Sequence, residues 1–298
     1  MVFVRKKKIK GREYHYLVAK TRVDGHEQRV ERYLGIHPPS QEDIKHYNKE
    51  FDQVKAFLSR QKVLLESIRQ EYQKRMQRAS TDERKALEEE LITNFTYNTS
   101  RIEGSSLTLK DTKLLLQDNI TPGEKPMRDV REAENHKQAF LQMKTRIAEQ
   151  VSHNLILEMH RMLKSGVSED AGTFRTAQVT VGSLLPIRAD LIEQEIKNLL
   201  NWNRRNQNLH PLERACVFHA VFERIHPFFD GNGRVGRLLM NFILMQEGLP
   251  PIIIRNKNRR RYYTALRKAD AGNMLLLIKY AYAELEEEMK RYGWYKVS

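Results

Sequence analysis

Two strongly apolar segments, LERACVFHAVFERI (residues 212–225) and VGRLLMNFILMQ (residues 235–246), frame the stretch HPFFDGNGRVGR (residues 226–237). Each segment is apolar on nearly every side, which is typical of a helix enclosed by other helices. The second segment ends at Gly248, and the prolines that follow it act as a stop signal. The sequence therefore predicts two central buried helices joined by a polar, glycine-rich loop.

The glycines and arginines of this loop indicate an anion site. Gly231 and Gly233 allow the backbone amides to turn toward one point, where the next helix begins with its positive end. Arg234 and Arg237 are three residues apart, so they share a helix face, and both can donate to phosphate oxygens. Taken singly, each feature has an ordinary structural explanation as a turn or a surface pair, but their spacing favours phosphate binding.

Two further side chains of the loop point to phosphate-ester transfer. Phosphates would repel the Asp230 carboxylate unless a cation lay between them, and Mg²⁺ is the usual choice. His226 is the nearby group that titrates close to neutrality, so it suits a general base, although a single histidine is more often a core residue. A general base, a carboxylate that can bind a metal ion and an anion site in one loop together indicate catalysis of phosphate-ester transfer.

The rest of the chain is expected to be mainly helical. Ser80 and Glu83 form a capping box, and the helices that flank it are predicted to pack together as a hairpin. Within GTFRTAQVTVGSLLPIR, Val179 and Val181 alternate around Thr180, which predicts a short strand or hairpin. The further predicted helices cover residues 41–77, 81–103, 128–148, 153–164 and 189–203.

The N-terminal segment, residues 2–35, predicts an antiparallel hairpin or three-stranded ribbon with a turn at Asp24-Gly25. It holds ten basic residues against four acids, so it suits either a nucleic-acid or partner-binding arm or a solvated face with charged edges. The segment from His37 to Ser40 is expected to be a linker.

Composition restricts the class of protein. The 298 residues carry a net charge of +14, which suits anionic partners such as a nucleotide, a nucleic acid or an acidic protein surface. The single cysteine, Cys216, excludes an intramolecular disulfide and is expected to be buried. The N-terminus lacks the apolar core of a signal peptide, and no apolar run reaches bilayer length, so we expect a cytoplasmic protein without a membrane partner.

The loop also resembles a known family. The pattern HPFx[DE]GNGRxxR is the signature of Fic domains, and residues 226–237 satisfy every specified position. The resemblance covers about residues 90–290 and implies a Fic-type helical bundle with a small β-hairpin flap. The expected organisation is therefore a basic β-ribbon arm (1–36), a linker with a helical hairpin (37–89) and a Fic domain with an inhibitory helix (90–290).

The resemblance implies a protein adenylyltransferase that transfers AMP from Mg-ATP to a Ser, Thr or Tyr hydroxyl of a target protein. His226 would deprotonate that hydroxyl, Asp230 would hold Mg²⁺, and the segment Val179–Gly182 would form the flap on which the target docks. The implied nucleotide-binding and flap residues are Val179, Thr180, Val181, Gly182, Asp230, Gly231, Asn232, Gly233, Arg234, Val235, Gly236, Arg237, Tyr262, Tyr263 and Asp270.

A second resemblance lies upstream. Class II Fic proteins carry the pattern [ST]xxxE[GN] on a helix before the core, and residues 99–104 fit it from Thr99 to Glu103. The resemblance implies that Glu103 pairs with Arg237 and restrains AMP transfer, because Arg237 would otherwise bind the γ-phosphate. It also implies that Glu103 can position water for the removal of AMP.

Other functions stay open from the sequence. A Fic enzyme can use another phosphate donor, although the intact glycines and arginines favour ATP. A regulatory protein on nucleic acid is the alternative from another class, supported by the basic ribbon and opposed by the intact His226 and Asp230. Self-modification and a homodimer are further expectations.

Overall fold

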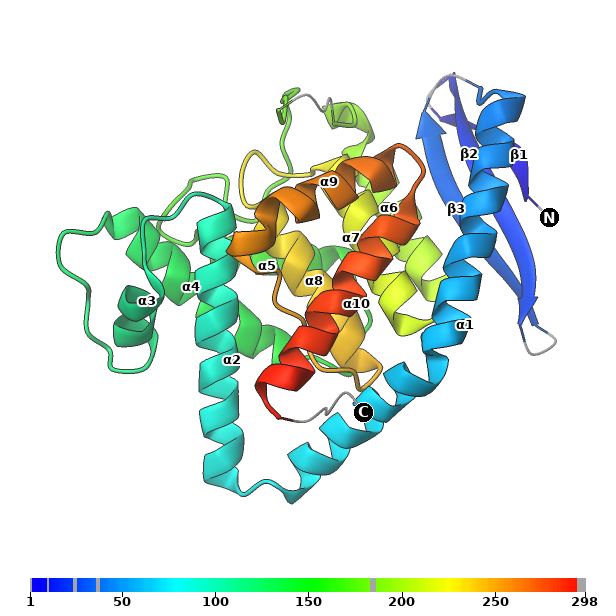
Figure 1. The fold of residues 1–298 in the computed structure, drawn as a ribbon. Helices are drawn as coiled ribbons and strands as arrows, with labels where there is room; N and C mark the ends of the chain where they lie inside the picture. The colour runs from blue at the N-terminus through cyan, green and yellow to red at the C-terminus, as the bar shows by residue number, and fades with distance from the viewer. Residues whose placement is uncertain (1, 10, 24–25, 36–37, 183–185, 294–298) are drawn as a thin grey trace.

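Helices dominate the computed structural model, which describes residues 2–9, 11–23, 26–35, 38–182 and 186–293 (Figure 1). The strands are β1 (Val2–Ile9), β2 (Arg12–Val23) and β3 (His26–Gly35). The helices are α1 (Gln41–Arg78), α2 (Thr81–Ile102), α3 (Leu109–Leu116), α4 (Met127–Thr145), α5 (His153–Lys164), η1 (Ala189–Leu191), α6 (Ile192–Arg205), α7 (Pro211–Ile225), α8 (Asn232–Gln246), η2 (Asn256–Asn258), α9 (Arg259–Asp270) and α10 (Met274–Arg291). The mainly helical class is confirmed.

Helices α7 and α8 pack against each other at the centre of the molecule, enclosed by the surrounding helices (Figure 1). Most of their side chains belong to one large apolar core, and Cys216 is fully buried there, as predicted. Helix α8 begins at Asn232, at the glycine turn where the sequence analysis expected the helix to start. Gly231 explains this start, because its left-handed φ of 84° turns the chain directly into the helix.

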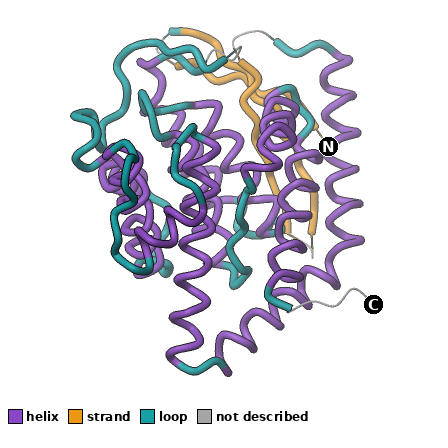
Figure 2. Tube along the Cα trace, turned by 60° about the vertical axis from the view of Figure 1, so that its left-hand side comes forward, coloured by secondary structure: helices purple, strands orange, loops and turns teal. Residues whose placement is uncertain are grey.

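The N-terminal ribbon is a three-stranded antiparallel sheet in the order β1-β2-β3, as the sequence predicted. It lies against the helical body beside α1 and α6 (Figure 1 and Figure 2). Tyr14 and Tyr16 are buried on this side and pack with Leu191 and the partly buried Ile187. The predicted turn at Asp24-Gly25 lies outside the described residues. The ribbon is therefore packed on the helical body through these two tyrosines.

Helix α2 begins with the capping box predicted at Ser80, and the structure shows a second capping box at the start of α1, where Ser40 caps the helix together with Asp43. The two helices differ from the expected packed hairpin, because they diverge from the connection at Ala79 (Figure 1). Helix α1 packs on α10, and α2 packs on α4, so each apolar stripe is already covered by another helix.

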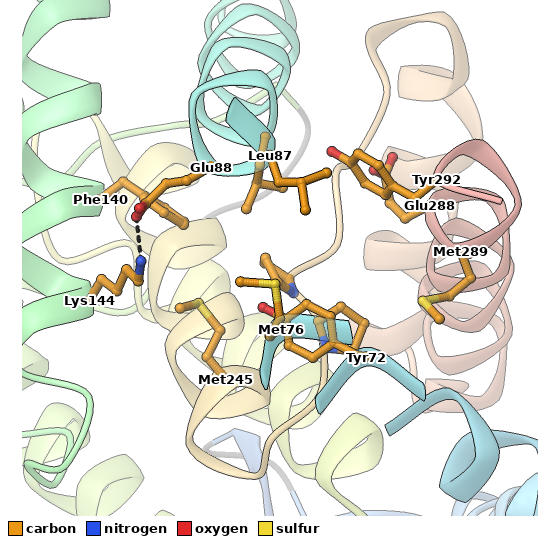
Figure 3. A pocket seen from close by; sticks show the side chains of 13 residues that line it. Tyr72, Met76, Leu87, Glu88, Phe140, Lys144, Met245, Glu288, Met289 and Tyr292 are labelled. Carbon is orange, nitrogen blue, oxygen red and sulfur yellow. Dashed lines mark hydrogen bonds and ion pairs between the residues drawn. The ribbon is translucent and has the colours of Figure 1, made fainter. Parts of the chain in front are cut away.

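A small apolar cavity of about 60 Å³ lies where α1 and α2 diverge (Figure 3). Tyr72 and Met76 of α1, Leu87 of α2 and Met289 of α10 line it. An ion pair between Glu88 and Lys144, 2.6 Å apart, lies at its edge. Side chains of α1, α2 and α10 thus enclose the space between the diverging helices.

The predicted flap, residues 179–182, is a loop without a regular strand in its described part. Val181 makes a single β-bridge, and residues 183–185 lie outside the described residues. Gln178 donates from Nε2 to the Pro186 carbonyl oxygen at 3.0 Å, which ties the two ends of the loop together. In the described part of the chain, no helix combines the length and apolar character needed to cross a bilayer.

Candidate functional site

The loop between α7 and α8 holds His226 in an unusual backbone conformation. His226 caps the end of α7 with φ 49° and ψ 62°, a left-handed conformation that costs a non-glycine residue about 1–3 kcal/mol. Arg175, which is 2% exposed, stabilises this conformation through hydrogen bonds to the backbone. Its Nε donates to the His226 carbonyl oxygen at 2.7 Å, and its backbone N–H donates to the Pro227 carbonyl oxygen at 2.9 Å. Arg175 therefore positions the histidine through the backbone.

The His226 ring is suited to accept a proton. Burial lowers its pKa, a hydrogen bond to the Glu223 carbonyl oxygen raises it, and the positive charge of Arg175 lowers it again. The net effect lowers the pKa below its ordinary value, so the ring is neutral at pH 7. One ring nitrogen donates to the Glu223 carbonyl, which leaves the other as an acceptor.

The start of α8 faces this histidine as an anion site. Gly231 is the N-cap and has no capping side chain, so the first helix amides stay available to a ligand. Asn232 is 2% exposed, and its carboxamide accepts from the Phe228 N–H at 2.9 Å and donates to the Phe228 carbonyl oxygen at 2.8 Å. The Asn232 side chain therefore stabilises the loop. Only the backbone amide of Asn232 stays available to bind a phosphate.

Asp230 lies at the mouth of the site, with 49% of its side chain exposed. Lys164 contacts its Oδ2 at 2.7 Å, Arg128 contacts the same oxygen at 3.1 Å, and Arg234 lies 3.5 Å from Oδ1. Burial would raise the pKa of Asp230, but the hydrogen bond from Lys164 and the charge of Arg234 lower it to about 2. The carboxylate is therefore ionised over the whole physiological range.

Three buried polar residues that the sequence analysis did not single out support this carboxylate. Lys164 and Glu132 form an ion pair at 2.9 Å, and Glu132 also pairs with Arg234 at 2.7 Å. His160 stacks on Phe228 with ring centroids 3.7 Å apart. Because His160 Nδ1 accepts from the Gly172 N–H, its Nε2 carries the proton and donates to the Asp230 carbonyl oxygen at 3.0 Å. The spacing of His160 and Lys164 on one face of α5 was the available signal.

Arg237 is 1% exposed and is already paired. Its Nη2 lies 2.6 Å from Glu103 Oε1, and its Nε donates to Thr99 Oγ1 at 2.7 Å. Burial opposes the charge of Arg237, but Glu103 raises the pKa of the guanidinium above its ordinary value. The structure thus brings together Thr99, Glu103 and Arg237, which are far apart in the chain.

The Glu103 carboxylate also lies over the first turn of α8. A Cβ atom added at Gly233 would lie 2.3 Å from Glu103 Oε1 and 2.9 Å from Arg237 Nη1. Both distances are shorter than a Cβ contact allows, so Glu103 can hold this place only while position 233 is a glycine and would have to shift if it were not. A carboxylate of the protein therefore lies where an incoming anion would meet the helix end.

The remaining predicted residues fall into two groups. Val235 is fully buried in the core, and Gly236 faces His219 on α7, so neither faces the anion site. Tyr262 is also fully buried, with its hydroxyl 2.7 Å from His219 Nε2. Tyr263 is 41% exposed beside the site, and Asp270 ends α9.

The flap residues form the second group. Thr180, Val181 and Gly182 are exposed, and Val179 is half-buried. A hydrogen bond joins Arg175 to the Ala177 carbonyl oxygen at 2.8 Å, which links the clamp on His226 to the segment leading into the flap. Arg175 therefore connects the backbone of His226 to the segment that leads into the flap.

Comparison with known proteins agrees with this geometry. Residues 150–244 match the Fic/DOC family, within the 90–290 segment whose limits stay a prediction. Protein adenylyltransferase fic-1 of Caenorhabditis elegans is 33% identical over 205 residues, which cover 66% of this chain and 40% of that protein. Protein adenylyltransferase Fic of Nematostella vectensis is 32% identical over 190 residues, which cover 62% of this chain and 44% of that protein. The chain thus spans less than half the length of these curated relatives.

Solved structures share the fold. Fic-1 from C. elegans superposes with a TM-score of 0.71 at 28% identity, covering 82% of this chain and 74% of that chain. A Fic domain containing signaling protein from Bacteroides thetaiotaomicron gives a TM-score of 0.68 at 25% identity, covering 75% of this chain and 95% of that chain. The chain therefore contains a Fic/DOC domain and is a homologue of Fic protein adenylyltransferases.

Proposed function

Because the chain carries a Fic/DOC domain, we propose that it is a protein adenylyltransferase that transfers AMP from ATP to a hydroxyl of a target protein. One observation carries this proposal: a neutral, proton-accepting His226 lies at the end of α7, and the open amides of α8 begin a few residues later. Buried Arg234 and Arg237 supply positive charge on the same helix. This arrangement suits phosphoryl chemistry, which depends on positioning and electrostatic stabilisation.

The proposed transfer is a single displacement at the α-phosphorus of ATP. The free ring nitrogen of His226 takes the proton of a Ser, Thr or Tyr hydroxyl, and that oxygen attacks the α-phosphorus of ATP. The bond between the α-phosphorus and the bridging oxygen breaks, and pyrophosphate leaves with that oxygen. The products are a target protein esterified with AMP and pyrophosphate, and His226 then releases its proton to solvent.

Magnesium fits the carboxylate at the mouth of the site. Among the described residues, no cluster of three or more His, Cys, Asp or Glu side chains could hold a metal alone. Mg²⁺ in nucleotide sites is usually held by one or two carboxylates together with the substrate phosphates, and the half-exposed Asp230 offers one. When bound, the ion would neutralise phosphate charge. Lys164 and Arg128 form ion pairs with Asp230, which keep its carboxylate ionised and fix its position.

Glu103 is proposed to restrain the enzyme. Its carboxylate pairs with Arg237 at 2.6 Å and lies against Gly233, so it occupies space and positive charge that a γ-phosphate would need. A carboxylate–guanidinium pair with one buried partner is strong, so a signal must displace Glu103 before Arg237 becomes available. The Glu103 side chain is 29% exposed, which leaves room for such a displacement. The same carboxylate could orient water for removal of AMP.

The target is proposed to dock on the exposed flap, residues 179–182, by adding an extended segment to its backbone. Self-modification, a homodimer, nucleic-acid binding by the ribbon and a cytoplasmic location stay predictions. A regulatory protein without catalysis is less well supported, because the histidine clamp, the anion site and the ionised Asp230 are all complete.

Labelling with ATP tests the proposal. Purified protein is incubated with Mg²⁺ and ATP labelled at either the α- or the γ-phosphate, in the presence of a cell extract, and the Glu103→Gly variant is compared with the unaltered chain. We expect label from the α-position only, faint in the unaltered chain and strong in the variant. The double variant with His226→Ala is the control and should transfer nothing. Label from the γ-position would mean phosphate transfer, and no label together with no ATP binding would overturn the proposal.

A further inference from the structure

The contacts of Arg237 divide between two helices. Its Nε donates to Thr99 Oγ1 at 2.7 Å, and its Nη2 lies 2.6 Å from Glu103 Oε1. Thr99 lies in α2 and Glu103 caps the end of that helix, so a movement of this helix end would loosen both contacts. The Arg237 Nη1 donates instead to the Tyr262 hydroxyl of α9 at 3.5 Å. Among the described side chains, Tyr262 is therefore the acceptor of Arg237 that does not belong to α2.

Burial makes the remaining acceptors of Arg237 important once Glu103 leaves. Arg237 is 1% exposed, so a lost partner leaves a buried charge uncompensated unless another group takes its place. In the proposed function the γ-phosphate takes the place of Glu103. Tyr262 is fully buried in the apolar core, so its ring is fixed and its hydroxyl stays in one position while the end of α2 moves.

The direction of the Tyr262 hydroxyl follows from its two polar neighbours. Arg237 offers only donors, so the Tyr262 oxygen must accept from Arg237 and the hydroxyl proton must point elsewhere. His219 Nε2 lies 2.7 Å from the hydroxyl and is the acceptor for that proton. Burial lowers the pKa of His219 to about 3, so the ring is neutral at pH 7 and carries its single proton on Nδ1. The hydrogen bonds therefore run in one direction, from Arg237 through Tyr262 to His219.

Glu223 lies at the end of this chain of groups. The His219 Nδ1 and the Glu223 Oε1 are both buried and lie 4.0 Å apart. A Cβ atom added at Gly236 would lie 2.6 Å from that oxygen and 2.9 Å from the His219 Nδ1. Glycine at position 236 thus leaves the space that both side chains occupy against α8. A protonated Nδ1 that faces an oxygen is the favourable arrangement, which agrees with the direction of the hydrogen bonds.

We infer that Tyr262 is a positioning residue for Arg237, oriented by His219 and Glu223, and that it keeps the guanidinium in place for the γ-phosphate once Glu103 has left. This role rests on the proposed function, in which Arg237 binds the γ-phosphate of ATP. It differs from the nucleotide contact that the sequence analysis expected of Tyr262, because the side chain is fully buried. Tyr262 acts on the nucleotide only through Arg237.

Nucleotide binding tests the role of the hydroxyl. In the Glu103→Gly background, the affinities for ADP and for a non-hydrolysable ATP analogue with Mg²⁺ are measured by calorimetry, with and without Tyr262→Phe. We expect the affinity for the ATP analogue to fall by about tenfold, the loss typical of a hydrogen bond to a charged group, and that for ADP to stay within about twofold. Tyr280→Phe removes a hydroxyl from a ring whose centroid lies 6.1 Å from that of Tyr262, and this control should change neither affinity. Equal loss for both nucleotides would overturn the inference, as would no loss for either.

A measurement without nucleotide separates this inference from the proposed function. The tautomer of His219 is determined by NMR from the chemical shifts of its ring nitrogens in the Glu103→Gly protein, and the signals are identified by their loss in the His219→Gln variant. We expect a neutral ring with its proton on Nδ1. A proton on Nε2 would overturn the inference, because the Tyr262 oxygen would then accept from His219. Failure of the Glu103→Gly protein to bind ATP would instead count against the proposed function, and the tautomer would then decide this inference alone.

Discussion

The Glu103 carboxylate and the Arg237 guanidinium lie 2.6 Å apart, although 134 positions separate them in the chain. Glu103 caps the C-terminal end of α2 and Arg237 lies in α8, so the pair spans the anion site at the start of α8. Arg237 is buried, whereas Glu103 keeps 29% of its side chain exposed. This asymmetry makes the glutamate the partner that can move.

Removing the charge of Glu103 should therefore change activity and stability in opposite directions. We expect Glu103→Gln to increase AMP transfer by about tenfold or more, and to lower the free energy of unfolding by about 1–3 kcal/mol because a buried charge loses its partner. Transfer is measured with α-labelled ATP, and stability by urea denaturation. The exposed carboxylate of Glu134 on α4 provides the control, and Glu134→Gln should change neither quantity. A stabilised, inactive Glu103→Gln protein would contradict the inhibitory role.

Gly233 and Glu103 should be energetically coupled. A Cβ atom at position 233 would collide with Glu103 Oε1, so Gly233→Ala should destabilise the unaltered chain more than it destabilises the Glu103→Gly variant. The coupling free energy from the four unfolding midpoints should be about 0.5–3 kcal/mol, the range for residues in contact. Additive effects of the two substitutions would show that Glu103 does not occupy this position in solution.

Much of this site could be predicted from the sequence because its parts are local. The loop residues from His226 to Arg237 lie together in the chain, and the buried helices on both sides are readable from their composition. The pairing of Glu103 with Arg237 required the resemblance to a family, because nothing in a single sequence relates positions so far apart. The capping box at Ser80 was predictable because it spans only four residues, whereas Ser40, which caps α1, was assigned to the linker.

The parts that were missed depend on tertiary contacts. Glu132 and Lys164 form an ion pair because α4 packs beside α5, a fact that neither helix encodes alone. Val235 and Gly236 were grouped with nucleotide-binding positions because they lie inside the motif, yet helical rotation turns both toward the core. The divergence of α1 and α2 likewise follows from which third helix covers each apolar stripe.

Arg175 should be a positioning residue for His226. Arg175→Lys keeps the charge but loses the planar set of donors to several carbonyl oxygens, so the left-handed turn loses support. In the Glu103→Gln background we expect kcat to fall by about 10- to 100-fold, with little change in KM for ATP, because Arg175 contacts the histidine backbone and not the anion site. Arg188 is exposed on the same segment and pairs with Asp190, so Arg188→Lys is the control. A change confined to KM would contradict the positioning role.

Buried histidines should make the protein sensitive to acid. Burial is the main cause that lowers the pKa of His136 and His219 to about 3, and that of His160 and His210 to about 4. Unfolding returns each group to about 6.5, so between pH 4 and 6.5 the unfolded chain binds more protons than the folded chain. The free energy of unfolding should therefore fall as the pH decreases through this window.

Two buried glutamates change the free energy of unfolding in the opposite direction as the pH rises. Burial raises the pKa of Glu213 to about 7 and that of Glu223 to about 8, so their contribution to stability is present below about pH 4.3 and is lost as the pH rises toward 8. Below pH 6.5 the effect of the four histidines on the free energy of unfolding is larger than that of the two glutamates. Above pH 6.5 only the glutamates still change it, so the urea midpoint should be highest near pH 6.5. Glu223→Gln should flatten the alkaline decrease, whereas replacement of the exposed His46 with glutamine should change neither limb. A midpoint that does not vary between pH 4.5 and 8 would show that these groups keep their ordinary pKa values in the folded protein.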